Sequence, residues 1–216
     1  MPLDRAHAAA TGVARALGRT EYESTWRAMQ AFTLARDASS EDEIWLTEHP
    51  PIYTLGLAGR MQHVRNENGI PVLRVDRGGQ VTYHGPGQLV AYVLVDLARR
   101  RLGVRAMVRA LERAVIDWLA AFGIVAHGRI DAPGVYVHRA GGECKIAALG
   151  LRVKRGCTYH GISVNIAMDL TPFDGIDPCG HPGLRVAQLA DFTNPPGLNA
   201  AGETLAPLIL RHIDAV

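Results

Sequence analysis

A glycine-rich stretch from Arg77 to Gln88 limits the possible folds of this chain more than any other segment. It reads Arg-Gly-Gly-Gln-Val-Thr-Tyr-His-Gly-Pro-Gly-Gln, and strand-like aliphatic runs lie on both sides of it, at 72–75 and 89–95. Glycine permits positive φ angles and close approach of the main chain to another molecule. The pattern leaves two interpretations open: the wall of a ligand pocket, or a hairpin with two tight turns.

Length and composition predict one globular domain. The chain has 216 residues, of which 48% are hydrophobic and 20% charged, enough for one sizeable core. We expect residues 1–12 to be an N-terminal extension and 13–216 to be a single domain. The net charge of +2 does not indicate a nucleic-acid partner. No apolar run reaches the roughly 18 residues that a membrane helix needs, and no signal sequence is visible; we expect a cytoplasmic monomer.

Hydrophobic periodicity predicts an α+β fold with a mixed, mostly antiparallel sheet flanked by helices. Thr20 and Glu23 have the spacing of a capping box at the start of a first helix. A second helix is expected over 104–122, and a last one over 202–213, where Pro207 fits only in the first turn. Strands are expected at 44–47, 72–75, 89–95, 144–153 and 158–166.

Two residues suggest covalent chemistry. Lys145 interrupts an apolar strand-like run at 144–153; it either snorkels to solvent or places a partly desolvated amine in a site, where it would serve as a base or thiolate partner. Cys179 stands between Pro178 and Gly180, on a tight turn that suits a reactive thiol. The other cysteines, Cys144 and Cys157, make the total odd, unlike a disulfide scaffold.

Some of these residues are also compatible with two other classes of site. A structural zinc site would draw on Cys144, Cys157, His160, Cys179 and His181, but the close ligand pairs of strong zinc signatures are missing. A nucleotide-using ligase would explain a glycine-rich turn. There is no G-x-x-x-x-G-K-[ST] motif, however, and the glycine pair precedes a strand, so a phosphate at a helix N-terminus is not indicated.

Five blocks of this sequence resemble the motifs of the lipoyl(octanoyl) transferases, in that family's order and spread over about residues 13–192. The family is similar in fold to the catalytic domains of the lipoate and biotin protein ligases. Gln80 stands where the family more often has an acidic residue. The blocks are 48–56, 77–88, 145–150, 160–165 and 173–180.

The resemblance implies a cytoplasmic acyltransferase, with Cys179 carrying an acyl thioester and Lys145 activating it. The implied reaction moves an octanoyl or lipoyl group from acyl carrier protein to a lysine of lipoyl domains, in 2-oxoacid dehydrogenase subunits and the glycine cleavage H protein. No metal, nucleotide or diffusible cofactor is implied. An ATP-dependent lipoate/biotin-type protein ligase is the alternative. The implied substrate-binding residues are Arg77, Gly78, Gly79, Gln80, Val81, Thr82, Tyr83, His84, Ala148, Leu149, Gly150, Gly161, Ile162 and Ser163.

A cluster of arginines suggests where the donor would dock. Acyl carrier proteins are acidic, and the densest basic cluster of the chain lies before and within the predicted second helix. A solvated helix face is the simpler interpretation of the same residues, because charge steering is screened by salt. The cluster comprises Arg99, Arg100, Arg101, Arg105 and Arg109.

Overall fold

The computed structural model describes residues 12–178 and 183–216. The strands are β1 (Gly12–Arg19), β2 (Asp42–Glu48), β3 (Ile52–Leu55), β4 (Val72–Arg74), β5 (Val81–His84), β6 (Gln88–Leu94), β7 (Ala126–Gly128), β8 (Gly134–Arg139), β9 (Gly142–Lys154), β10 (Cys157–Asn165) and β11 (Arg185–Val186). The helices are α1 (Tyr22–Ala35), α2 (Leu97–Arg100), α3 (Val104–Ala120) and α4 (Leu198–Asp214), with short 3-10 turns η1 (Met61–His63), η2 (Thr171–Gly175) and η4 (Leu189–Asp191).

A large mixed sheet forms the centre of the described molecule. Its eight strands run in the order β1-β2-β6-β10-β9-β8-β7, and β11 pairs with β9. Only the pairs β1–β2 and β9–β11 are parallel. Every residue of β6 is buried, which explains why this interior strand is a continuous apolar run rather than an alternating one. The predicted mixed, mostly antiparallel α+β architecture is confirmed.

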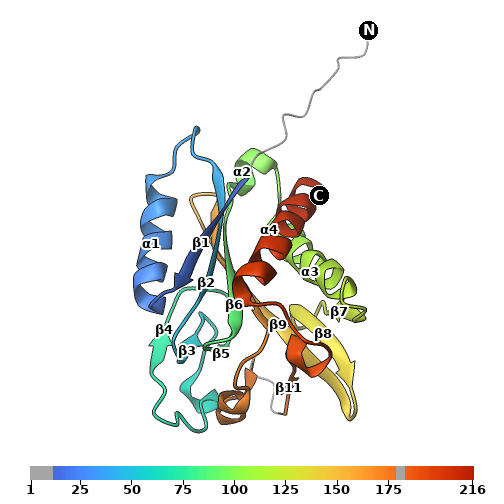
Figure 1. The fold of residues 1–216 in the computed structure, drawn as a ribbon. Coiled ribbons are helices and arrows are strands. Elements are labelled where there is room, and N and C mark those ends of the chain that lie inside the picture. Colours follow the sequence, from blue (N-terminus) through green and yellow to red (C-terminus); the bar gives the residue numbers. More distant parts are fainter. Residues whose placement is uncertain (1–11, 179–182) are drawn as a thin grey trace.

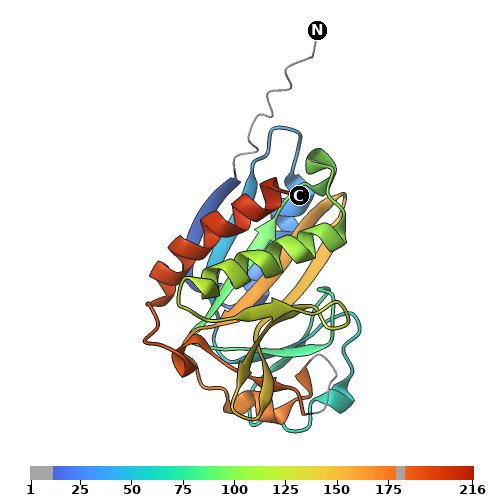
Figure 2. The same cartoon turned by 90° about the vertical axis from the view of Figure 1, so that its right-hand side faces the viewer.

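Helices cover both faces of the large sheet. Figure 1 shows α1 on one side and α3 with α4 on the other, and Figure 2 shows α3 and α4 lying side by side across their face. The α3–α4 side holds the main core, in which Trp118 and Leu205 pack with Ala91 and Val93 of β6. Met29 of α1 packs in a separate cluster on the opposite face. Among the described residues, no helix has the length and hydrophobicity needed to cross a membrane.

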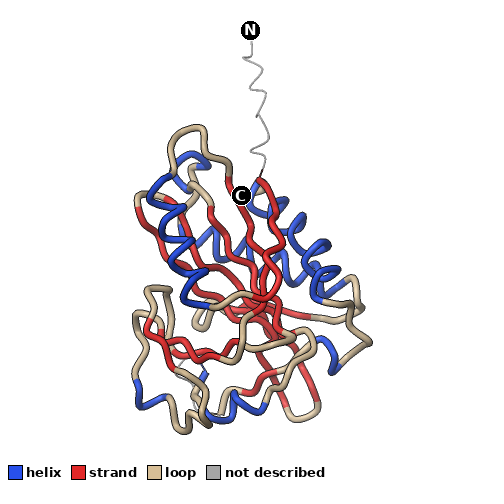
Figure 3. The backbone as a smooth tube through the Cα atoms, turned by 60° about the vertical axis from the view of Figure 1, so that its left-hand side comes forward, coloured by secondary structure: helices blue, strands red, loops and turns tan. Residues whose placement is uncertain are grey.

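A second, small sheet of order β4-β3-β5 lies at the end of the molecule opposite α2 (Figure 1), where loops are abundant (Figure 3). Because β5 pairs with β3 and β6 belongs to the large sheet, the hairpin interpretation of the glycine-rich stretch is wrong. The turn at 85–87 instead carries the chain from the small sheet to the large one. Gly87 adopts φ 86° there, a conformation that favours glycine.

Two predicted helix ends differ from the structure. The first helix begins at Tyr22 with Glu21 as its N-cap and no side-chain cap, because the Thr20 hydroxyl bonds instead to that of Thr47 (2.8 Å). The last helix begins at Leu198, which places Pro207 inside it. The loss of one backbone hydrogen bond at Pro207 is tolerated because the apolar face of α4 is buried in the main core.

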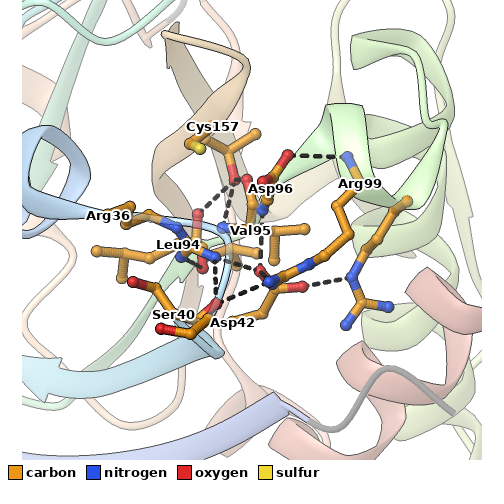
Figure 4. Close-up of polar contacts among 12 residues, drawn as sticks. Arg36, Ser40, Asp42, Leu94, Val95, Asp96, Arg99 and Cys157 are labelled. Carbon is orange, nitrogen blue, oxygen red and sulfur yellow. Dashed lines mark hydrogen bonds and ion pairs between the residues drawn. The ribbon is translucent and has the colours of Figure 1, made fainter. Parts of the chain in front are cut away.

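Two arginines of the predicted basic cluster, Arg99 and Arg100, belong to a structural ion-pair network at the α2 end of the sheet (Figure 4). Asp42, only 1% exposed, binds the guanidinium groups of Arg36 (2.6 Å), Arg99 (2.7 Å) and Arg100 (2.5 Å). The Arg100 side chain is 5% exposed and also pairs with Asp214. Arg99 and Arg100 therefore stabilise this end of the sheet, and the surface proposed for the acidic donor loses two of its five cations.

Candidate active site

A pocket lies between the glycine-rich segment and the α1-facing side of the large sheet. It is partly open to solvent, and its lining is mostly apolar. All the expected substrate-binding residues except Gly78 and Tyr83 line it. The lining residues are Tyr22, Arg77, Gly79, Gln80, Val81, Thr82, His84, Val90, Tyr92, Ala148, Leu149, Gly150, His160, Gly161, Ile162 and Ser163.

Tyr83 does not line this pocket, because successive residues of a strand face opposite sides. Thr82 and His84 face the pocket, whereas Tyr83 packs in the small sheet's own core. Its ring centroid lies 5.4 Å from that of Phe173 and 5.6 Å from that of Tyr53. The Tyr83 ring therefore belongs to this core, and its expected substrate contact stays a prediction.

Gly78 supports the pocket through its main chain. Its N–H donates to the carbonyl of Leu151 on β9 (2.9 Å). A Cβ atom on Gly150 would lie 2.7 Å from the Gly78 carbonyl oxygen, closer than real Cβ contacts. These two glycines let the glycine-rich segment lie directly on β9, which forms one side of the pocket.

Arg77 fastens the start of the glycine-rich segment to β3. The side chain is buried, and its Nε donates to the Thr54 hydroxyl (3.1 Å) while its Nη2 donates to the Thr54 carbonyl (2.6 Å). Its Nη1 donates to the Gly78 carbonyl (2.9 Å). Arg77 thus holds the segment that forms the pocket wall, in addition to lining the pocket.

Asp76 organises the sheet side of the pocket, and the sequence contained no signal for it. Its carboxylate accepts from Trp26 Nε1 (2.7 Å), from His160 Nε2 (3.0 Å) and from the Tyr159 hydroxyl. Burial would raise its pKa, but the hydrogen bonds from His160, Tyr159 and Trp26 outweigh burial and hold the pKa well below its usual range. An ionised Asp76 therefore links α1 to β10 beneath the pocket.

His49 is a buried, neutral histidine behind the pocket. Its Nδ1–H donates to the Thr20 carbonyl (2.7 Å), so its Nε2 accepts from the Tyr92 hydroxyl (2.6 Å). Burial lowers the pKa of His49 to about 4, although the Thr20 hydrogen bond and Glu48 oppose this shift. Burial also lowers the pKa values of His84 and His160, which line the pocket.

These histidines predict a loss of stability in mild acid. When unfolded, His49 takes up a proton below about pH 6.5, whereas in the fold it stays neutral down to about pH 4. The unfolded state therefore binds more protons in this interval, and the free energy of unfolding decreases as the pH falls through it. For His49 alone the expected loss between pH 7 and 4.5 is about 2.5 kcal/mol.

Urea unfolding of the parent and of His49→Gln at the two pH values measures this effect. The variant keeps His84 and His160, so its own loss should be smaller than that of the parent by about 2–3 kcal/mol. An equal loss in both proteins would contradict the assignment of a neutral, buried His49.

Lys145 lies in a second, smaller cavity that adjoins the first. Thr82 and Ala148 line both cavities, and Pro178 lines the second. Lys145 is 3% exposed; its Nζ donates to the Pro133 carbonyl (3.1 Å) and lies 5.0 Å from the centroid of the Tyr136 ring. Lys145 is therefore a desolvated amine in a cavity that adjoins the larger pocket, and the snorkelling interpretation is wrong.

The described cysteines lie away from this amine. Cys144 faces the opposite side of β9 from Lys145 and packs in the main core, as expected for adjacent strand residues. Cys157 begins β10 near Asp96, at the α2 end of the sheet, and burial raises its pKa. Cys179 lies outside the described residues; in sequence it directly follows Pro178, which lines the Lys145 cavity.

The residues considered for zinc are not gathered by the described structure. Cys144 and Cys157 are separated as above, and His160 bonds to Asp76. In residues 12–178 and 183–216, no group of three or more His, Cys, Asp or Glu side chains is arranged to hold a metal ion. Cys179 and His181 are outside these ranges.

Sequence analysis missed four pocket residues. Tyr22 lines the pocket from the first turn of α1, although its helical spacing indicated core packing. Val90 and Tyr92 belong to β6, an interior strand that is buried on both faces. Its apolar sequence therefore did not indicate which of its two faces lines the pocket. His160 could have been found from the sequence, since it begins one of the motif blocks. In the structure its φ is 60°, which is unusual for a residue other than glycine.

Comparison with known proteins agrees with this geometry. The model of the lipoyl protein ligase A/B catalytic domain matches residues 21–206. An octanoyltransferase of Dechloromonas aromatica is 54% identical over 202 residues, covering 94% of this chain and 97% of the relative. An octanoyltransferase of Thiobacillus denitrificans is 60% identical over 187 residues, covering 87% and 82%. The fold resembles a lipoate-protein ligase A crystallised with ATP, at a TM-score of 0.70 and 17% identity, covering 93% of this chain and 83% of the ligase.

Proposed function

Because the chain belongs to the lipoyl protein ligase A/B catalytic domain family, we propose that it is an octanoyltransferase that supplies the acyl group for protein lipoylation. High identity to octanoyltransferases over most of both chains supports this activity. The observation that carries it is the buried amine of Lys145, in a cavity that adjoins the apolar pocket and includes Pro178 next to Cys179. This arrangement suits an acyl group held by a thioester.

We propose a reaction in two acyl transfers. The thiolate of Cys179 attacks the octanoyl thioester of an acyl carrier protein, and the carrier's thiolate leaves and takes a proton from the Lys145 ammonium. The amine of a lipoyl-domain lysine then attacks the Cys179 thioester, which gives the amide and restores the thiol. A free cysteine is only a few per cent thiolate at neutral pH, so a nearby ammonium at Lys145 would favour the reactive form. In the second step Lys145 would accept the proton of the incoming amine.

The larger pocket is the proposed site of the octanoyl tail. Val81, Leu149 and Ile162 contribute apolar atoms to its wall. Burying seven carbons at roughly 0.8 kcal/mol each could contribute about 5 kcal/mol before ordering costs. That is enough to favour an eight-carbon chain over much shorter ones.

The proposed substrates are two proteins, an octanoyl-acyl carrier protein as donor and lipoyl domains as acceptors. The acceptors would be those of 2-oxoacid dehydrogenase subunits and the glycine cleavage H protein. We place the reaction in the cytoplasm. The buried thiols of Cys144 and Cys157 are unpaired, as is usual in a reducing compartment.

The test is intact-protein mass spectrometry after incubation with octanoyl-acyl carrier protein, with and without ATP. We expect one octanoyl adduct on the protein without ATP, and its loss when a lipoyl domain is added. An adduct or product that forms only with ATP would contradict the transferase and favour an ATP-dependent ligase.

A further inference from the structure

The turn before β8 packs tightly against the amine of Lys145. Besides the hydrogen bond from Nζ to Pro133, the next residue, Gly134, lies alongside the lysine side chain. A Cβ atom at Gly134 would come within 3.0 Å of Lys145 Cε and 3.2 Å of its Nζ, and Gly134 has φ 143°. Only glycine fits here without displacing the amine. Whatever holds this turn therefore also fixes the position of Lys145.

A buried carboxylate on α3 holds the turn. Oε1 of Glu112 accepts from the Gly134 N–H (2.9 Å), and the residue is 8% exposed. A Cβ atom at Gly128 would lie 3.0 Å from Glu112 Oε2, so the absence of a side chain there makes room for the carboxylate. Glu112 thus joins α3 to the peptide that carries the hydrogen-bond acceptor of Lys145.

This position on α3 is costly for a carboxylate. The neighbouring turns of the helix bury Leu111 and Val115 in the main core, and a buried acid is destabilising unless it is paired. Burial raises the pKa of Glu112, while the Gly134 N–H, Arg109 and Lys145 act in the opposite direction. The carboxylate of Glu112 and the amine of Lys145 both lie against Gly134, so the two charges are close enough to interact.

We propose that Glu112 is a positioning residue for Lys145, fixing its amine through the Pro133–Gly134 peptide and favouring its protonated form. The inference rests on the proposed function, because it assigns a task to Glu112 only if Lys145 takes part in acyl transfer. Glu112 would contribute to the state of Lys145 both through its negative charge and through its hydrogen bond to Gly134. Different substitutions of Glu112 remove these two contributions.

Other charged or titratable groups surround this pair and set the background against which Glu112 acts. The guanidinium of Arg129 lies over the ring of Tyr136, the same ring that the Lys145 amine contacts. Glu143 forms an ion pair with Arg129 (2.8 Å). Asp177 is engaged by Arg65 (3.3 Å). Arg109 also acts on Glu112, and Asp131 pairs with Arg129.

Removing the negative charge of Glu112 should shift the pH profile of acylation in one direction only. A nearby anion stabilises protonated forms, so its loss lowers the pKa of the Lys145 amine and of a thiol that titrates with it. Both limbs of the pH profile of acylation should then move to lower pH. Loosening of the turn alone would reduce the rate at every pH and leave the limbs in place.

The experiment measures cysteine acylation by a small octanoyl thioester from about pH 5.5 to 9.5 in four proteins. Glu112→Gln keeps a hydrogen-bond acceptor and removes the charge; we expect both limbs to shift down by about 0.5–1 pH unit. Glu112→Asp keeps the charge but is too short to reach Gly134; we expect unshifted limbs and a maximum reduced by about tenfold. Glu143→Gln, the matched control on the same strand as Lys145, should resemble the parent.

Each outcome bears on a different claim. Unshifted limbs in folded Glu112→Gln, or an equal shift in Glu143→Gln, would overturn the role of Glu112. If Glu112→Gln does not fold, the test rests on the pH profile of acylation by Glu112→Asp. A maximum rate like that of the parent would then overturn the positioning role. Lys145→Ala in the same assay separates this from the proposed function. Parent-like acylation by that variant would mean that Lys145 is not catalytic, whereas a slow Lys145→Ala beside an unshifted Glu112→Gln would reject only the inference about Glu112.

Discussion

Replacing Cys179 by serine is expected to abolish both the acyl adduct and the amide product. A serine hydroxyl is a far weaker nucleophile than a thiolate at neutral pH, and Lys145 cannot ionise it to a comparable extent. An acyl group that reached the serine would form an ester, which is a poorer donor to the acceptor lysine than a thioester. Mass spectrometry of the intact protein measures the adduct, and transfer to a lipoyl domain measures the product.

The other two cysteines are matched controls for this prediction. Cys144 is buried in the main core, and Cys157 lies at the α2 end of the sheet with a raised pKa. Cys144→Ser and Cys157→Ser should therefore leave transfer largely intact, apart from some loss of stability at these buried positions. Peptide mapping that located the octanoyl group on Cys144 or Cys157 would overturn the assignment of Cys179.

Replacing Lys145 by alanine is expected to slow acylation by about two to four orders of magnitude, roughly what the loss of a positioned acid–base group costs. The amine is 3% exposed and held by Pro133 and Tyr136, so its environment would be defined before any substrate binds. An alkylating probe at neutral pH should also label Cys179 much more slowly in the variant, because the ammonium that favours the thiolate is gone.

Lys154→Ala is the control for this second prediction. Lys154 ends the same strand, β9, but is exposed to solvent, so its loss should change neither acylation nor alkylation. Thermal unfolding of both variants shows whether any loss of rate comes from loss of structure. A folded Lys145→Ala with parent-like acylation would remove the lysine from the mechanism.

The architecture explains why a site of this kind needs two sheets. Thr82 of the small sheet and Ala148 of the large sheet line both the Lys145 cavity and the larger pocket. The turn at 85–87 connects the two sheets, and Arg77 holds the glycine-rich segment to β3. The larger pocket thus lies where the core of the small sheet, which includes Val81, meets the cluster on the α1 side of the large sheet, which includes Val90 and Tyr92.

Much of the fold and of the candidate site was accessible from the sequence alone. The apolar run at 89–95 indicated a strand, and β6 is an interior strand of the large sheet that is buried along its whole length. The glycine-rich stretch indicated the wall of a pocket, and Gly79, Gln80 and Val81 line one. These predictions succeeded because they depend on local properties of the chain: side-chain hydrophobicity along a strand, and the space that a glycine leaves.

Other properties depended on contacts between distant segments, and only the tertiary structure decided them. Arg99 and Arg100 had the composition of a docking surface, yet Asp42, more than 50 positions earlier, binds both. The strand after Gly79 pairs with β3 rather than with its neighbour β6, so the hairpin is absent. Glu112 lies on a helix, where a charged residue is usually expected to face solvent. Its partner, Gly134, is brought to it only when α3 packs on the sheet, because a hydrogen bond between remote residues has no signature in the sequence near either one.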